Sequence, residues 1–217
     1  MVERTEELMI AFKSEIAKKI NKLDGKFRFD QIFYDWVKVM AVTIENNSQY
    51  HLNKKHMLTY EELFKKYGRN YFEVFSECFA LLIQLFLSEG IKDHLGEIYH
   101  ELRMHNANKG QFFTPFSASL FLADRAITSE ILEESQKRTI RILEPACGAG
   151  SIVLAQVDTI KKRGGNLNRF EFTCCDIDEN VLMMCFVQMA LAGANVTCIL
   201  GNMLQDEIRE KWIVRKY

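Results

Sequence analysis

Proline is scarce in this chain of 217 residues, and basic residues are not in excess over acidic ones. Only Pro115 and Pro145 occur, so the sequence holds no Pro-Pro dipeptide and no polyproline segment. The 28 Lys and Arg residues are balanced by 29 Asp and Glu, which gives a formal net charge of −1. Proteins that coat nucleic acid usually carry a basic excess. The balance therefore excludes a strongly basic nucleic-acid coat, but not a local basic patch.

Signals for membranes, secretion and metal binding are also missing. No stretch approaches 18 apolar residues, and residues 1–7 lack the basic and then apolar design of a signal peptide. The six cysteines show no C-x-x-C spacing, so we expect reduced, buried thiols in a cytoplasmic protein without membrane contact. His100-Glu101 begins like H-E-x-x-H, but Met104 stands where the second histidine belongs. We therefore expect no metal site, and we expect His51 and His56 at the surface.

Helical periodicity fills residues 1–106, which we expect to form a domain of four to five helices. Hydrophobic residues make up 48% of the chain, enough for a sizeable core. Thr59 and Glu62 form a capping box that predicts the start of one helix. Residues 71–87 predict a central buried helix ended by Gly90, and residues 91–105 predict another. An apolar helix face runs through Phe29, Ile32, Phe33, Trp36, Val37, Met40 and Ile44.

After residue 107 the pattern changes to alternating strands and helices. Buried strands are expected at residues 141–143, 170–175 and 196–200, with helices at about 151–162, 179–192 and 203–217. Parallel strands need crossover helices. We therefore expect an α/β fold in which a helical bundle precedes a doubly wound parallel sheet. Ligands bind such sheets at the carboxyl ends of the strands.

The loops at that edge carry polar groups suited to a small ligand. Gly148 and Gly150 permit a tight turn and close approach to the backbone, and Glu144 adds a carboxylate. Asp176 ends the second strand 26 positions after Gly150, where an acidic side chain accepts both hydroxyls of a ribose. A dinucleotide fingerprint would need glycine where Val153 stands. From these loops alone, a plain strand–helix turn remains an equal alternative to a nucleoside site.

Four segments occur in an order typical of one enzyme family. Residues 93–99 (D-H-L-G-E-I-Y) run into Gly110-Gln111-Phe112-Phe113-Thr114-Pro115, which looks like a G-Q-F/Y-F/Y-T-P signature. Residues 144–150 (E-P-A-C-G-A-G) are similar to a D-P-A-C-G-S-G loop. Residues 175–178 (C-D-I-D) and 201–204 (G-N-M-L) follow. Together they resemble the S-adenosylmethionine-dependent N6-adenine DNA methyltransferases, particularly the modification subunits of type I restriction systems. The resemblance covers about residues 91–205 and implies a Rossmann-like sheet, S-adenosylmethionine as the cofactor and DNA as a partner.

The resemblance also implies where the cofactor lies. Phe113, Thr114 and Pro115 would hold its methionine end. The loop beneath the methionine and the ribose would be lined by Glu144, Ala146, Gly148 and Gly150.

The remaining implied contacts follow the second and third strands. Asp176 would accept the ribose hydroxyls, with Ile177 against the adenine ring. Asn202 would sit by the adenine amino group, and Met203 would pack nearby. Many relatives have Asp at the position of Asn202, but an amide carbonyl can accept the same hydrogen bond.

The family's catalytic motif, [N/D]-P-P-[Y/F], is not found in the sequence. In these enzymes its first side chain and a backbone carbonyl accept hydrogen bonds from the amino group of a flipped adenine, and its aromatic ring stacks on the base. Only 15 residues follow Asn202. The resemblance therefore implies that residues 107–217 are the first half of a methyltransferase domain without catalytic residues. It also implies that residues 141–143 form an exposed sheet edge.

Three hypotheses follow. The first is the cofactor-binding part of a restriction-modification type DNA adenine methyltransferase, inactive alone or completed by another polypeptide that brings it to DNA. The second is a non-catalytic relative that serves as a protein-interaction module. The third is a methyltransferase for a non-DNA substrate. An exposed edge should be paired, either with a second copy in a homo-oligomer or with a restriction-modification subunit.

Overall fold

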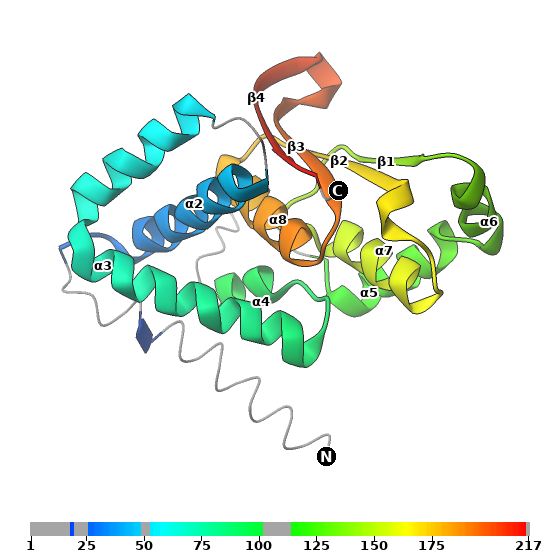
Figure 1. The fold of residues 1–217 in the computed structure, drawn as a ribbon, viewed down its shortest axis with the longest axis horizontal. Helices are drawn as coiled ribbons and strands as arrows, with labels where there is room; N and C mark the ends of the chain where they lie inside the picture. The colour runs from blue at the N-terminus through cyan, green and yellow to red at the C-terminus, as the bar shows by residue number, and fades with distance from the viewer. Residues whose placement is uncertain (1–17, 20–25, 49–52, 102–113, 216–217) are drawn as a thin grey trace.

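The computed structural model of the chain describes residues 18–19, 26–48, 53–101 and 114–215 (Figure 1). Its strands are β1 (Ile140–Glu144), β2 (Phe170–Asp176), β3 (Asn195–Asn202) and β4 (Glu207–Val214). Its helices are α2 (Phe29–Ser48), α3 (Lys54–Glu89), α4 (His94–Glu101), α5 (Phe116–Ala126), α6 (Ser129–Lys137), α7 (Ser151–Lys162) and α8 (Glu179–Leu191). Two short 3-10 helices are also present: η2 (Leu167–Arg169) directly precedes β2, and η3 (Met203–Gln205) precedes β4.

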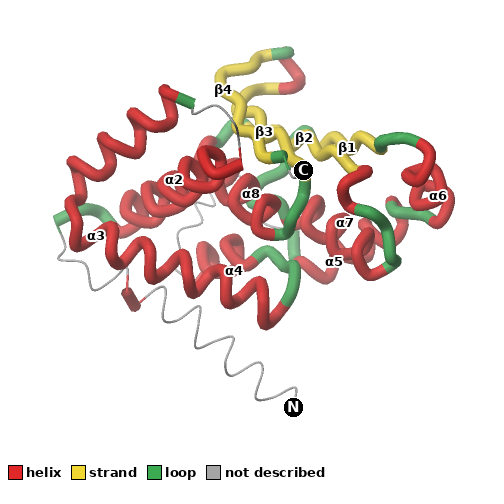
Figure 2. Tube along the Cα trace, in the orientation of Figure 1, coloured by secondary structure: helices red, strands yellow, loops and turns green. Residues whose placement is uncertain are grey.

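The sheet confirms the α/β class expected from the sequence. Its strand order is β1-β2-β3-β4, with β1, β2 and β3 parallel and β4 antiparallel to β3. The two crossovers run through α7 and α8 and progress in the same direction across the sheet. Right-handed crossovers of that kind place both helices on one face. Figures 1 and 2 show α7 and α8 together on one side of the strands.

Burial along β2 follows from this one-sided layer of helices. Phe170, Phe172 and Cys174 are buried, and Glu171 and Thr173 between them are partly exposed. Successive side chains of a strand point to opposite faces, so the first three lie on the face that packs against α8. The sheet therefore has one face inside the core and one face that is more open.

The helices from the first hundred residues share the core with the sheet. α2 packs on α8 and on β4, and α4 packs on α8. The largest buried side chains come from both parts of the chain, with Trp36 in α2 and Trp212 in β4 among them. A domain boundary near residue 107 stays a prediction.

The end of the described chain corrects one prediction. Residues 203–217 were expected as one amphipathic helix, but Glu207–Val214 forms β4. Trp212 and Val214, two residues apart, are both buried, which is the periodicity of a strand. Gly201 makes the return possible, because a Cβ there would collide with the carbonyl oxygen of Glu207. Pairing with an open strand edge and burial of Trp212 outweigh the local helical pattern.

Helix α3 corrects a second prediction. The capping box at Thr59 and Glu62 does not begin a helix, because α3 already begins at Lys54, with Asn53 as its N-cap. The Thr59 hydroxyl instead donates to the carbonyl of Lys55 within the helix. The predicted end at Gly90 is confirmed, with φ of 80°. Within α3, Gly68 has φ of 75° and interrupts the helical backbone.

Helix α3 is also more exposed than a central core helix. Phe72, Phe75 and Leu82 are buried as expected, but Leu87 is 81% exposed. Among the described helices, α3 is the one whose length and composition would allow it to cross a membrane. A core helix passes the same test. The expectation of no membrane contact therefore stays a prediction.

The surface position expected for His56 is wrong; His51 lies outside the described residues. His56 is buried and stacks on Trp212, with ring centroids 3.6 Å apart and an interplanar angle of 4°. Its Nδ1 shares a hydrogen bond with Glu45 of α2, and its Nε2 lies 3.1 Å from Glu210 Oε1 of β4. A polar sequence neighbourhood did not reveal these partners, because Glu210 is 154 positions away and Glu45 belongs to a different helix.

Candidate functional site

The loop between β1 and α7 is held by backbone hydrogen bonds. The Cys147 N–H donates to the carbonyl of Cys175 in β2, and the Gly150 N–H donates to the carbonyl of Cys147, both at 2.9 Å. Gly148 and Gly150 have φ of 53° and 99°, a region that favours glycine. At Gly148 an added Cβ would meet no atom within 4 Å, so this backbone faces open space that a ligand can enter.

Asp176 joins this loop to the end of β2. Its Oδ2 accepts from the Gly148 N–H and its Oδ1 accepts from the Asp178 N–H, each at 2.9 Å. A carboxylate has about four acceptor positions, so each oxygen keeps capacity for another donor. Asp178 caps α8, since its side chain accepts from the Asn180 N–H. The two backbone donors fix the Asp176 carboxylate in one orientation at the carboxyl edge of the sheet.

Glu144 supplies a second carboxylate at the same edge. Burial raises the pKa of its carboxyl above the ordinary value, although a hydrogen bond from the Ala146 N–H works against that rise. The register aligns Glu144 with Cys174 of β2, two residues before Asp176. Glu144 therefore ends β1 two residues short of Asp176, which still pairs with Leu200 of β3.

Gln188 of α8, which belongs to none of the sequence motifs, connects the glycine loop to α4. Its Oε1 accepts from the Leu95 N–H at 2.8 Å, and its Nε2 donates to Asp93 Oδ1 at 2.8 Å and to the carbonyl of Ala149 at 2.9 Å. Asp93 is buried, and this burial raises its pKa. The signal that could have found Gln188 is a polar residue within the apolar stretch of residues 181–191.

A cavity of about 440 Å³ opens beside this network. It is bounded by α4 and the start of α5, and it is lined by Asp93, Gly96, Glu97, His100, Thr114, Pro115 and Phe116. The carbonyl of Thr114 accepts from the Ser151 hydroxyl at 3.1 Å, and Ser151 also hydrogen-bonds Ser119 of α5. Thr114 is thereby tied to the first turn of α7, directly after the glycine loop.

The third strand end completes the edge. Asn202 Oδ1 accepts from the Leu204 N–H at 3.0 Å, so the side chain caps η3, which begins at Met203. Ile177, next to Asp176, is 64% exposed. Arg209 of β4, which the sequence analysis did not single out, donates to the carbonyl of Ile177 at 2.9 Å.

The structure thus places most of the predicted site residues in loops that meet at one edge. Gly148 and Asp176 are in direct contact, and Thr114 is tied to the start of α7. Phe113 lies outside the described residues. The individual binding roles of these residues stay predictions.

The sequence relationship fits this geometry. Residues 90–213 match the family model described as N-6 DNA Methylase, which is more than half of the chain. The chain therefore belongs to the N-6 DNA methylase family.

Two other comparisons add less. Among curated proteins, none matches the chain significantly. A Listeria monocytogenes crystal structure assigned to the class I S-adenosylmethionine-dependent methyltransferases matches with a TM-score of 0.49 and 18% identity. The match covers 91% of this chain and 53% of that chain, so the present chain spans about half the length of that protein.

Proposed function

We propose that this chain binds S-adenosylmethionine at the carboxyl edge of its sheet and supplies the cofactor-binding part of a DNA adenine-N6 methyltransferase. The observation that carries the proposal is the contact between the two loops, in which the Gly148 N–H donates to the Asp176 carboxylate. It puts an oriented acceptor next to a backbone with open space above it. That combination suits a ribose with two hydroxyl donors.

The neighbouring groups suit the rest of the cofactor. The exposed Ile177 side chain offers an apolar surface for the adenine ring, with Met203 and Asn202 at the next strand end. Glu97 and Thr114 both line the 440 Å³ cavity. The Glu97 carboxylate would attract the ammonium group of the methionine end. When bound, the cofactor supplies an electrophilic methyl group on a sulfonium.

Transfer of that methyl group to DNA needs a part that this sequence does not contain. No [N/D]-P-P-[Y/F] is present, so we propose that the chain alone does not methylate adenine. A further polypeptide segment, in a complete enzyme of the restriction-modification type, would position the base and contact DNA. Free cysteines at all six positions support the proposal of a cytoplasmic protein.

A calorimetric titration with S-adenosylmethionine tests cofactor binding. We expect saturable binding by the wild-type chain and its loss in Asp176→Ala. Asp124→Ala is a matched control, because Asp124 pairs with Arg163 just after the far end of α7 from the glycine loop. Circular dichroism and thermal unfolding would establish that all three proteins are folded.

The outcomes separate the hypotheses. No heat from folded wild-type protein would contradict a working cofactor site and leave a protein-interaction module. Binding together with methyl transfer to a DNA adenine by the isolated chain would contradict the proposed inactivity. Binding together with transfer to a non-DNA substrate would favour the third hypothesis.

A further inference from the structure

The cavity beside α4 has two walls, and both are tied to the end of the glycine loop. One wall is α4, and the other is formed by Thr114 and the start of α5. The Gln188 side chain links the first wall to Ala149, and the Ser151 side chain, at the start of α7, holds the second wall. Ala149 and Ser151 are two positions apart, so both walls share one reference point next to Gly148, where the candidate ribose site lies.

Gln188 uses both of its polar side-chain atoms in the first link. Its Oε1 accepts from the Leu95 N–H, and the two hydrogens of its Nε2 are donated to Asp93 Oδ1 and to the Ala149 carbonyl. Asp93 Oδ1 also accepts from the Gly96 N–H at 2.9 Å, so the carboxyl folds back over the first turn of α4. A Cβ at Gly96 would lie 2.3 Å from Asp93 Oδ2, so this arrangement needs glycine there. Gln188 is fully buried, so water does not replace these partners.

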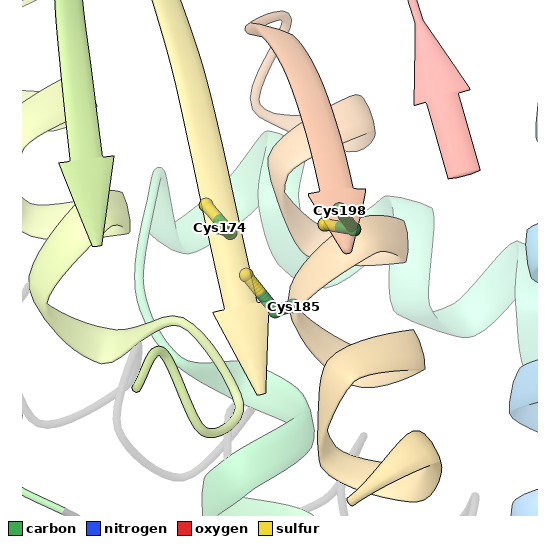
Figure 3. Close-up of side chains that lie close together, drawn as sticks. All are labelled: Cys174, Cys185 and Cys198. Atoms are coloured by element: carbon green, nitrogen blue, oxygen red, sulfur yellow. The ribbon is translucent and has the colours of Figure 1, made fainter. Parts of the chain in front are cut away.

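Helix α8 fixes the position of Gln188 relative to the sheet. Cys185 lies three residues before Gln188, on the same side of the helix. Its thiol packs with those of Cys174 in β2 and Cys198 in β3, and the three Sγ atoms lie within 4.8 Å of one another. Figure 3 shows these thiols gathered between the sheet and the helix. The burial expected for them is confirmed. Because a Cβ at Gly150 would lie 2.9 Å from Cys185 Sγ, α8 also packs closely against the glycine loop.

Ser151 makes the second link through its hydroxyl. That hydroxyl donates to the Thr114 carbonyl at 3.1 Å, so its oxygen is left to accept the Ser119 hydroxyl at 2.8 Å. Both serines are buried. Since Ser119 belongs to α5, one hydroxyl of α7 holds both parts of the second wall.

We propose that Gln188 and Ser151 are positioning residues that let one cofactor molecule contact the ribose site and the cavity at the same time. This inference rests on the proposed function, which assigns the ribose to Gly148 and Asp176 and the amino-acid end to the cavity. A ligand held at two points gains affinity from the second contact when the two points are kept at a fitting separation. Loosening either link should remove that gain and leave the contacts at the ribose site in place. Both residues act through the walls that they hold, not by contact with the cofactor.

Two ligands that differ at one end test this assignment. S-adenosylhomocysteine and 5′-methylthioadenosine share the adenosine part and an uncharged sulfur, but only the first has the amino-acid end. We expect Gln188→Leu and Ser151→Ala each to weaken S-adenosylhomocysteine binding about tenfold, and 5′-methylthioadenosine binding by less than about twofold. Calorimetric titration of folded proteins measures both affinities. A purely structural role would not separate the two ligands.

Gln156→Leu in α7 and Ser135→Ala in α6 are matched controls that should keep both affinities. Gln156 Oε1 is buried without a hydrogen-bond partner among the described residues, and the buried Ser135 hydroxyl donates to the Leu132 carbonyl of its own helix. Equal weakening of both ligands by Gln188→Leu or Ser151→Ala, or no weakening of either, would overturn the positioning role of that residue while cofactor binding stands. Folded wild-type protein that binds neither ligand would contradict the proposed function itself, and the positioning roles with it.

Hydrogen exchange of the wild-type chain tests the first link without a variant that could fail to fold. The Leu95 N–H donates to Gln188 Oε1, so its exchange reports the opening of this link. A ligand slows the exchange of an amide when it binds only the closed state. At equal saturation, S-adenosylhomocysteine should therefore slow Leu95 exchange about fivefold or more relative to 5′-methylthioadenosine. Equal slowing by both ligands would overturn the positioning role of Gln188.

Discussion

At the scale of single residues, Gln188 has the largest set of buried polar partners near the site. One amide side chain satisfies the Leu95 N–H, the Asp93 carboxyl and the Ala149 carbonyl. Replacing it by leucine keeps the volume but leaves all three groups without this partner. Buried polar groups left unpaired cost about 1–3 kcal/mol each, so we expect Gln188→Leu to lower the free energy of unfolding by about 3 kcal/mol or more. Urea unfolding measures this change.

Gln156→Leu in α7 is the matched control. Its Oε1 is buried without a hydrogen-bond partner among the described residues. Its loss should change the free energy of unfolding by less than about 1 kcal/mol. Equal effects of the two substitutions would show that the Gln188 network contributes nothing specific to stability.

Residue-level prediction succeeded where a motif carries the information. Gly148 and Asp176 were singled out from spacing and resemblance, and the structure joins them through one hydrogen bond. Gln188 and His56 gave no such signal, because the Gln188 side chain bonds Leu95, Asp93 and Ala149, 39 to 95 positions away, and His56 pairs with Glu210, 154 positions away. Hydrogen-bond partners at that separation are set by tertiary packing, which local sequence does not encode.

At the scale of elements, a polar cluster links α3 to β4. Glu210 of β4 accepts from Lys55 at 2.5 Å and lies 3.1 Å from His56 Nε2. Burial alone would raise the pKa of Glu210, but the hydrogen bonds from Lys55 and His56 outweigh it and hold the pKa below the ordinary value of 4.5. A carboxyl with a lowered pKa in the folded state binds its proton more tightly when unfolded. Its stabilising contribution is therefore present at neutral pH and is lost as the pH falls from about 4.5 through the lowered pKa.

Glu210→Gln should show this dependence. We expect it to lower the free energy of unfolding by about 1 kcal/mol at pH 7, and the difference from wild type to shrink as the solution is acidified below the ordinary pKa. Urea unfolding of both proteins at pH 7 and at a pH below the ordinary pKa of a glutamate measures this difference. Glu61→Gln, at an exposed position of α3, should be neutral throughout. A wild-type advantage that grew on acidification would contradict this assignment.

Element prediction was most reliable where strand and helix patterns repeat. The limits of α7, β2 and α8 follow the expected boundaries closely, because Gly150 and Asp178 mark the helix starts. β4 was predicted as a helix, because EIREKWIV contains charges at helical spacing. The open edge of β3 and the burial of Trp212 decide in favour of a strand, and neither is visible in a short window.

At the scale of the whole molecule, the two sheet edges differ. The β4 edge carries charged residues, and its pairing with β3 is irregular at Leu200 and Gly201, both features that discourage further pairing. No described strand pairs with the outer edge of β1, and Leu143 in that strand is 56% exposed. The expected exposed edge at residues 141–143 is confirmed for the described part of the chain, but the burial predicted for this strand is wrong, because Arg141 and Leu143 are exposed.

Leu143→Lys tests whether this edge drives association. A lysine on an edge strand discourages pairing, so we expect a lower average mass than wild type at high protein concentration, measured by size-exclusion chromatography with light scattering. Leu204→Lys is the matched control, because Leu204 is 97% exposed but lies in η3. Equal reductions by both substitutions would point to general surface hydrophobicity instead.

The open β1 edge also has a directional consequence. A closed dimer uses a twofold axis and the same patch on both molecules, so two copies joined edge to edge would set β1 against β1 in antiparallel fashion. A strand that continued the β1-β2-β3 pattern would instead run parallel to β1. The polarity of whatever strand docks there would therefore distinguish self-association from completion of the sheet by a different segment.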